Sequence, residues 1–397
     1  MNFDVDGAKA LMDITARPDI VFVKGSGSWL EDQNGKRYLD MIQGWAVNAL
    51  GHSPKELVQA ITQQANALIN PSPAFYNAPA MALAKKITEN SCFDRVFFAN
   101  SGAEANEGAI KLARKWGQLY KDGAHKIITF EHSFHGRTLA TMSASGKAGW
   151  DRIFAPQVDG FRKAKLNDIE SVRSLVTDKT VGIMLEPVQG EGGVIPASDE
   201  FMQALRQLCD DEKILLIVDE VQTGMGRTGQ LFAYQHSGIE PDIMTLGKGI
   251  GGGVPLSALC AKEAVSVFEH GDQGGTYNGN PLVTAAGVAV FNTITHVDFM
   301  KTVQERAQQL SQGLQNLSNQ WGLQGERGLG LLRVLKLDKD DAGKMVETAR
   351  NLTPNGLLLN AARPNLLRFM PALNLTEADL EQTLALLNQV LAKHRDS

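Results

Sequence analysis

Two short apolar runs in the middle of the chain each end at a charged residue and then turn at glycines. Residues 214–218 run into Asp219, and residues 243–246 are followed by Gly247 and Lys248. A short apolar run bounded by turn signals is typical of a strand that is buried on both faces of a sheet. Open α/β sheets bind their ligands where such strands end. We therefore expect Asp219 and Lys248 to face one common site.

Similar runs recur between about residues 60 and 290, with helical patterns between them. The further strand candidates are residues 96–99, 126–130, 181–185 and 256–260. Alternation of this kind predicts a mostly parallel sheet that is covered by helices. The predicted fold class is therefore α/β.

The two ends of the chain differ from this middle part. Asn34-Gly35 lies between alternating segments and predicts a β-hairpin. After residue 290, long polar helices and short strands at 331–337 and 366–370 indicate a smaller α+β unit. The expected domains are an N-terminal segment that joins the small domain (1–60), a large ligand-binding domain (61–290) and a C-terminal small domain (291–397).

The composition excludes several classes of protein. The 397 residues carry a net charge of −5 and contain no basic block of the kind that binds nucleic acid. No apolar stretch has the length of a membrane span, and the acidic start lacks the pattern of a signal peptide. Cys92, Cys209 and Cys260 form neither a disulfide framework nor a metal-binding spacing. We expect a cytoplasmic protein that binds no metal, nucleic acid or membrane.

A helix start follows the first of these strands. Ser101 and Glu104 have the spacing of a capping box. The segment is either an ordinary capped helix or a phosphate site, in which the small residues Gly102 and Ala103 let backbone N–H groups approach an anion. The presence of Asp219 and Lys248 elsewhere in the chain favours the phosphate site.

Charged and aromatic residues follow the other predicted strands. Phe134 is a core residue or a ring that stacks on a ligand, and Arg137 is a surface ion-pair partner or a carboxylate-binding residue. Neither His132 nor His135 has a third metal ligand nearby. Arg368 lies within an apolar run, so it must be paired, either in a structural ion pair or with a bound anion.

Asp219 and Lys248 allow more than one interpretation. A lysine after a strand is usually a solvated loop residue, and an aspartate there often begins a turn. A nucleotide-binding loop needs Ser or Thr after the lysine, where this chain has Gly249. A pyridoxal phosphate enzyme uses such a lysine to form a Schiff base and such an aspartate to hold the pyridinium nitrogen. Together with the phosphate helix, this last interpretation is favoured.

The chain resembles the class III, fold-type I pyridoxal phosphate aminotransferases from near its start to near its end. The motifs that carry the resemblance are 101–106, 134–138, 219–224, 226–229, Lys248 and 276–282. The resemblance implies a large domain with a mostly parallel seven-stranded sheet and a smaller α+β domain built from both chain ends. It also implies a homodimer with shared active sites.

The resemblance implies a role for each matching residue. Lys248 would hold the cofactor covalently and move the proton, and Asp219 would keep the pyridine nitrogen protonated. Thr276 would reach the phosphate of the neighbouring subunit. The implied cofactor-binding residues are Ser101, Gly102, Ala103, Phe134, Asp219, Glu220, Val221, Gln222, Lys248 and Thr276. The implied substrate-binding residues are Arg137, Glu191, Gly275 and Arg368.

The flanks at 47–52 and 367–374 are most similar to those of acetylornithine aminotransferases. The expected reaction passes the δ-amino group of N2-acetylornithine to 2-oxoglutarate. A broader ω-aminotransferase is the alternative within the family, and a decarboxylase or aminomutase is the alternative chemistry. A metabolite-binding protein is the alternative that is not an enzyme. Gly275 departs from the family, which usually has Ser or Thr there, so a hydroxyl contact is missing or is made by water.

Overall fold

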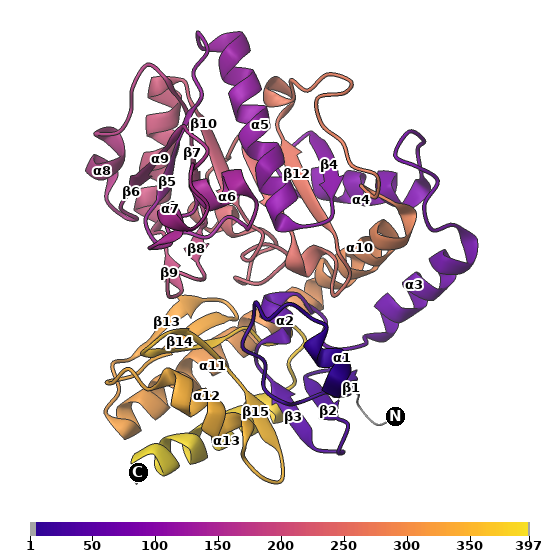
Figure 1. Ribbon diagram of the computed structural model, residues 1–397, viewed down its shortest axis with the longest axis vertical. Coiled ribbons are helices and arrows are strands. Elements are labelled where there is room, and N and C mark those ends of the chain that lie inside the picture. The colour runs from indigo at the N-terminus through magenta and orange to yellow at the C-terminus, as the bar shows by residue number, and fades with distance from the viewer. Residues whose placement is uncertain (1–4, 396–397) are drawn as a thin grey trace.

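A seven-stranded sheet forms the centre of the large lobe, in the order β4-β12-β11-β10-β7-β5-β6 (Figure 1). The computed structural model describes residues 5–395. Residues 1–4, on which the expected absence of a signal peptide partly rests, lie outside that range. The strands are β4 (Arg95–Ala99), β5 (Lys126–Phe130), β6 (Phe161–Ala164), β7 (Thr180–Leu185), β10 (Leu215–Asp219), β11 (Ile243–Leu246) and β12 (Ser257–Ala261).

The predicted α/β class and the mostly parallel sheet are confirmed. β12 is antiparallel to both of its neighbours, and the pairings of β11, β10, β7, β5 and β6 are parallel. The sequence did not predict β6, whose residues Phe-Arg-Lys-Ala are not a continuous apolar run. The reason is its position at the edge of the sheet, where one side is solvated.

β10 is buried on both faces because helices cover both sides of the sheet. Leu215 and Ile217 pack in one apolar cluster with residues of α5, whereas Leu216 and Val218 pack in another with residues of α9. Adjacent residues of a strand point to opposite faces, so the whole run has to be apolar. The helices of this lobe include α3 (Lys55–Ala67), α4 (Ala78–Glu89), α5 (Gly102–Tyr120), α6 (Leu139–Ala144), α7 (Trp150–Ile153), α8 (Ile169–Arg173), α9 (Asp199–Glu212) and α10 (Pro281–Ile294).

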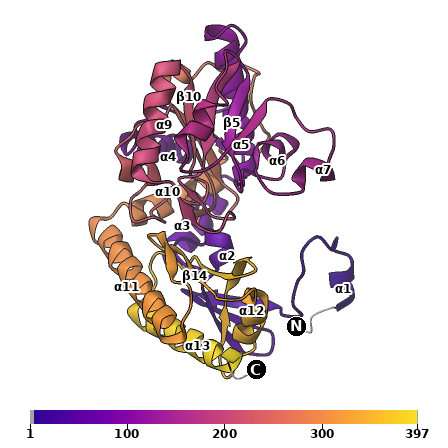
Figure 2. The same ribbon diagram turned by 90° about the vertical axis from the view of Figure 1, so that its left-hand side faces the viewer.

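The small lobe combines segments from both ends of the chain. The predicted hairpin at Asn34-Gly35 joins β2 and β3, and β3 also pairs in parallel with β15, so that Leu39 lies opposite Leu357. A second sheet has the order β13-β14-β17-β16, and α11 lies alongside α13 (Figure 2). The elements are β1 (Phe22–Ser26), β2 (Trp29–Asp32), β3 (Arg37–Asp40), α11 (Val297–Trp321), β13 (Glu326–Leu329), β14 (Leu332–Lys336), α12 (Ala342–Arg350), β15 (Gly356–Leu358), β16 (Asn360–Arg363), β17 (Leu366–Phe369) and α13 (Glu377–Arg395).

Shorter elements complete the chain as the structure describes it. These are α1 (Val5–Lys9), α2 (Gln43–Ala46), β8 (Val188–Gln189) and β9 (Ile195–Pro196), together with single turns of 3-10 helix at Ala233–Ser237, Lys248–Ile250 and Glu263–Val265. Within residues 5–395, no single helix is long and apolar enough to cross a membrane. Only the pair α10 and α11, which is bent by 73°, meets that criterion jointly.

A buried arginine joins the two lobes. Arg227, which lies between β10 and β11, donates from Nη1 to the carbonyl oxygens of Leu331 at 3.2 Å and Pro371 at 2.5 Å. The backbone N–H of Leu331 in turn donates to the carbonyl oxygen of Arg227 at 2.9 Å. Burial lowers the pKa of Arg227 to about 9, so the side chain stays charged at neutral pH. The guanidinium therefore satisfies two carbonyl groups of the small lobe from the large one.

We expect Arg227→Ala to lower the free energy of unfolding by about 3 kcal/mol, because two carbonyl groups lose their donor at a buried position. Urea denaturation of wild type and variant measures the difference. Arg152→Ala is the matched control, since the Arg152 side chain is 89% exposed. Equal stability of the two variants would contradict this role for Arg227.

Candidate active site

A cavity of about 620 Å³ lies between the two lobes, at the carboxyl ends of β10 and β11. Asp219 is the last residue of β10 and Lys248 follows β11, as predicted, while Trp45 and Asn360 come from the small lobe. A volume of this size suits a small-molecule ligand. The lining residues are Trp45, Ser101, Gly102, Ala103, Asn106, Phe134, His135, Gly136, Arg137, Glu186, Glu191, Asp219, Val221, Gln222, Lys248 and Asn360.

The buried carboxylate of Asp219 is held by donors from three segments. His135 Nδ1 and Asn106 Nδ2 contact Oδ2 at 2.7 and 2.8 Å, and the backbone N–H of Val221 donates to Oδ1 at 3.1 Å. Because a carboxylate only accepts, Nδ1 of His135 carries a proton. The Asn106 amide is oriented by Thr245, whose hydroxyl donates to Oδ1 at 2.7 Å. Oδ1 of Asp219 retains a lone pair for a donor in the cavity.

Lys248 is an unpaired lysine deep in this cavity. Its ammonium makes no hydrogen bond or ion pair with any residue between 5 and 395. Burial lowers the pKa of Lys248, and the nearby carboxyl groups, Asp219 foremost, only partly oppose this. The backbone of Lys248 has a φ of 45°, which is uncommon for a residue other than glycine and is found at functional sites. A lysine in this state is suited to act as a nucleophile and proton carrier.

The N-terminus of α5 forms one end of the cavity. Ser101 caps the helix through a hydrogen bond from the backbone N–H of Glu104 at 3.3 Å, and Glu104 accepts from the N–H of Ser101 at 2.7 Å. The predicted capping box is therefore present. Gly102 and Ala103 line the cavity at the positive end of the helix, which favours an anion.

A wall of the cavity is closely fitted around Val221. A Cβ atom on Gly102 would lie 2.6 Å from Cγ1 of Val221, and one on Gly247 would lie 3.0 Å from the same atom. Phe134, which also lines the cavity, packs edge-on against Trp150. The apolar side chains of Val221 and Phe134 therefore line the same cavity as Asp219.

One arginine lines the cavity and another contacts its lining residues, and the two differ in burial and in pairing. Arg137 is exposed, lies over the Trp150 ring at 5.0 Å and forms no ion pair within the described chain. Arg368 is buried and contacts Glu191 Oε1 at 2.6 Å through Nη2 and Asn360 Oδ1 at 2.9 Å through Nε. Its Nη1 is buried without a partner among residues 5–395. Although burial opposes it, the charge of Arg368 lowers the pKa of Glu191.

Glu186 is an acid in the cavity to which sequence reasoning gave no role. Its carboxyl oxygens accept from the backbone N–H groups of Phe134 at 2.9 Å and Gly190 at 3.3 Å. Burial, together with the charge of Asp219, raises the pKa of Glu186 to about 8. His135 and Asn106 likewise belong to the cavity. Their signal in the sequence was only their place inside motifs, because their partner Asp219 is distant along the chain.

Four of the predicted site residues do not line this cavity, and one of them, Arg368, touches it only through Glu191 and Asn360, which do. The carboxylate of Glu220 is turned into the core, where it accepts from the N–H groups of Ala233 at 2.7 Å and Tyr234 at 2.8 Å. We correct the expectation for Glu220 to a structural role, because adjacent residues at a strand end point to opposite sides. Gly275 lines a separate cleft, and the carbonyl of Thr276 accepts from Asn70 at 3.4 Å.

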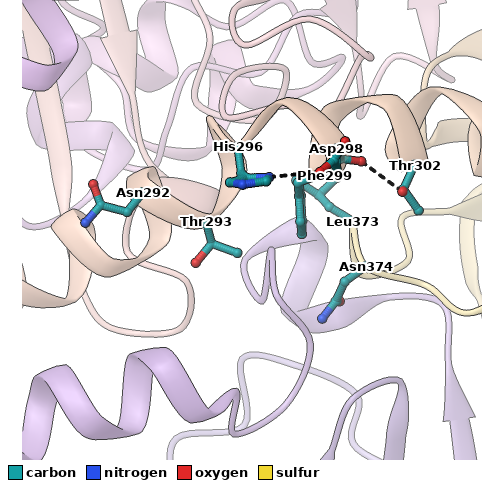
Figure 3. A pocket seen from close by; sticks show the side chains of 8 residues that line it. All are labelled: Asn292, Thr293, His296, Asp298, Phe299, Thr302, Leu373 and Asn374. Carbon is teal, nitrogen blue, oxygen red and sulfur yellow. Dashed lines mark hydrogen bonds and ion pairs between the residues drawn. The ribbon is translucent and has the colours of Figure 1, made fainter.

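A further cleft of about 510 Å³ lies beside the corner between α10 and α11 (Figure 3). Its ionisable side chains among the described lining residues are His296 and Asp298, which form an exposed ion pair at 3.8 Å. The other lining residues are Asn292, Thr293, Phe299, Thr302, Leu373 and Asn374. The cleft contains no buried charged group among these residues, in contrast to the cavity around Lys248.

The fold and the cavity are those of a pyridoxal phosphate enzyme: a mostly parallel sheet with a cavity at its strand ends, a free lysine and a buried aspartate. Sequence comparison identifies the same class. The chain matches the family "Aminotransferase class-III" over residues 13–391, and it belongs to that family. These enzymes depend on pyridoxal 5'-phosphate. The residues of the cavity fit this group, since Lys248 is unpaired, Gly102 and Ala103 offer helix N–H groups, and Asp219 has a free lone pair.

Similar proteins match along the whole chain. "Acetylornithine aminotransferase 2" of Bordetella pertussis is 67% identical over 395 residues, which is 100% of each chain. "Acetylornithine aminotransferase" of Ralstonia nicotianae is 65% identical and covers 97% of this chain and 98% of its own. The solved N-acetylornithine aminotransferase from Stenotrophomonas maltophilia is 34% identical, with a TM-score of 0.83 over 96% of this chain and 97% of its own. The solved ornithine aminotransferase from Toxoplasma gondii is 30% identical, with a TM-score of 0.92 over 98% and 94%.

We expect Glu186 to make the stability of the protein depend on pH. The folded protein keeps the Glu186 proton up to about pH 8, whereas the unfolded chain releases it near about pH 4.3. The stabilisation is therefore complete below about pH 4 and is lost as the pH rises to about 8. The Gln side chain of Glu186→Gln cannot ionise. The difference in melting temperature, variant minus wild type, should therefore increase as the pH rises from about 5 to about 8.

Thermal melts of the cofactor-free proteins across this pH range measure the difference. Glu89→Gln, at a side chain that is 57% exposed, is the matched control and should follow wild type at every pH. Parallel curves for Glu186→Gln and wild type would contradict a raised pKa at Glu186.

Proposed function

We propose that this protein transfers the δ-amino group of N2-acetyl-L-ornithine to 2-oxoglutarate, giving N-acetylglutamate 5-semialdehyde and glutamate. This reaction belongs to arginine biosynthesis, and a cytoplasmic location is part of the proposal. The names of the relatives at 65–67% identity support it. The observation that carries it is a pair of arginines, one free at the mouth and one neutralised by Glu191 in the interior.

The cofactor, when bound, supplies an electron sink that stabilises negative charge on the carbon attached to the reacting nitrogen. Lys248 holds the cofactor and carries the proton between the two carbons involved, a task for which its lowered pKa suits it. Asp219 holds the ring nitrogen, with His135 and Asn106 fixing the carboxylate. Gly102 and Ala103 hold the phosphate, while Phe134, Val221 and Gln222 orient the ring.

The arginines account for two substrates of different length. In the donor half-reaction Arg137 binds the α-carboxylate of acetylornithine, which leaves the δ-amino group near Lys248. Glu191 neutralises Arg368 during this half-reaction. In the acceptor half-reaction Arg137 binds the distal carboxylate of 2-oxoglutarate and Arg368 binds its α-carboxylate through the unpartnered Nη1.

We also propose a homodimer with shared active sites. Gly275 and Thr276 lie away from the cavity of their own chain, beside a cleft of about 550 Å³. Phe75 and Tyr76, which line this cleft, are 68% and 93% exposed. Large exposed apolar side chains that gather in one place indicate a protein interface. A second copy on this surface would bring Thr276 to the phosphate site of its neighbour.

A half-reaction assay tests the donor. Acetylornithine, ornithine, succinylornithine and 4-aminobutyrate are added singly to the purified holoenzyme, and the visible absorbance of the bound cofactor is followed. We expect acetylornithine to bleach the band most efficiently and 2-oxoglutarate to restore it. Fastest bleaching by another donor would replace the proposal with the broader ω-aminotransferase.

We expect Glu191→Ala to change the choice of donor, because Arg368 then stays charged and unpaired during the donor half-reaction. The kcat/KM for acetylornithine should fall about tenfold relative to that for glutamate, which presents its α-carboxylate to Arg368. Steady-state kinetics with both donors measure the ratio. Glu326→Ala, which breaks the Arg333–Glu326 pair at 3.1 Å, is the control, since neither residue lines the cavity. An unchanged ratio in Glu191→Ala would refute the switch.

A further inference from the structure

The short element α2 is a turn of left-handed backbone. Its residues Gln43, Gly44, Trp45 and Ala46 have φ angles of 48°, 62°, 60° and 65°. Residues other than glycine avoid this region because Cβ approaches the following carbonyl oxygen. Runs of such residues persist only where the surrounding structure determines them, and they are found at active sites and ligand clamps. Figure 1 shows α2 at the junction of the two lobes.

The anchoring of the turn is extensive. Asp40 Oδ1 accepts from the backbone N–H groups of Ile42 at 2.8 Å and Gln43 at 3.1 Å, and its Oδ2 contacts His52 Nε2 at 2.8 Å. The side-chain amide of Gln43, which is fully buried, donates to the carbonyl oxygen of Asp40 at 3.1 Å. Ala46 is buried in an apolar cluster that joins residues of the small lobe to Val188 and Val194 of the large lobe. These contacts fix the backbone on both sides of Trp45.

The consequence is an aromatic side chain held at the mouth of the cavity. Trp45 lines the cavity and is 51% exposed, whereas Asp219 is 3% and Glu186 is 6% exposed. Arg137, which lines the same cavity, is likewise exposed, so these two side chains mark the solvated part of its lining. An extended donor whose amino group reaches Lys248 in the interior therefore has its other end between Arg137 and Trp45.

We propose that Trp45 is a specificity-determining residue that contacts the N-acyl group of the donor and selects N-acylated over free diamino acids. This proposal rests on the proposed function, in which Arg137 takes the carboxylate at that end. The acyl amide is neutral, planar and partly apolar, so the indole face contacts it with little loss of hydration. A free ammonium in the same place keeps its charge and loses water, and it also faces the like charge of Arg137.

The acceptor makes a different demand on this end of the cavity. 2-Oxoglutarate has a carboxylate at each end, and both are taken by arginines. No acyl group is then present for the indole to contact. The contribution of Trp45 should therefore appear in the donor half-reaction and be small in the acceptor half-reaction.

The experiment compares holoenzymes of wild type, Trp45→Ala, Trp45→Leu and Trp45→Phe in separate half-reactions, followed by the absorbance of the bound cofactor. Trp45→Ala should lower kcat/KM for acetylornithine about tenfold, the scale of a lost small-group contact in an apolar pocket. Ornithine and 2-oxoglutarate should change less than about twofold. Trp45→Phe should recover most of the preference, and Trp45→Leu should not. Tyr120→Ala, at an exposed aromatic residue on α5 outside the cavity, is the control.

The outcomes separate this proposal from its premise. If wild type uses acetylornithine but Trp45→Ala and Trp45→Leu keep the wild-type ratio of acetylornithine to ornithine, the role of Trp45 is overturned and the proposed function stands. An equal loss for both donors and 2-oxoglutarate overturns it as well, because it indicates a structural role. If wild type does not bleach with acetylornithine, both fail. Should Trp45→Ala not fold, Trp45→Leu and Trp45→Phe decide between these outcomes.

Discussion

The carboxylate of Asp219 is the constraint on which the site depends. It lies at the end of a strand that is buried on both faces, so besides the backbone N–H of Val221 it needs donors from other segments. They come from Asn106 on α5 and His135 in the segment after β5, and Thr245 on β11 fixes the amide of Asn106. The hydrogen bonds to this one carboxylate thus bring together α5, the segment after β5 that carries His135, and β11, which leads to Lys248.

The charges in the cavity divide it into two regions. Near Lys248, burial weakens the hold of that lysine on its proton and strengthens the hold of Glu186 on its own. A lysine and a carboxyl that both tend towards their neutral forms lie in the same cavity as Asp219. At the mouth, Arg137 remains solvated. A substrate that enters therefore contacts the charged Arg137 first and reaches Lys248 and Glu186, whose protonation can change, afterwards. Binding followed by proton transfer requires this order.

The sequence predicted the parts of the fold that local pattern determines. Mainly apolar runs located β10 and β11 because strands buried on both faces consist mostly of apolar residues, while the edge strand β6 had no such pattern. Asp219, Lys248 and the helix start at Ser101 were predicted to converge because strand ends share one edge of a sheet. Glu186 and Trp45 could not be predicted, since the burial of the first and the backbone of the second follow from tertiary contacts. Glu220 was misplaced because adjacency to Asp219 says nothing of which way a side chain turns.

The pairing of β3 with β15 has a consequence for how the protein folds during its synthesis on the ribosome. The edge of β3 at Leu39 has no strand to pair with until Leu357 of β15 has been synthesised, roughly 300 residues later. At ordinary rates of synthesis this delay lasts roughly 15 to 60 s. The large lobe, with Asp219 and Lys248, is complete well before that time. The part of the cavity lining that Asn360 provides is therefore added last, after the residues of the large lobe are in place.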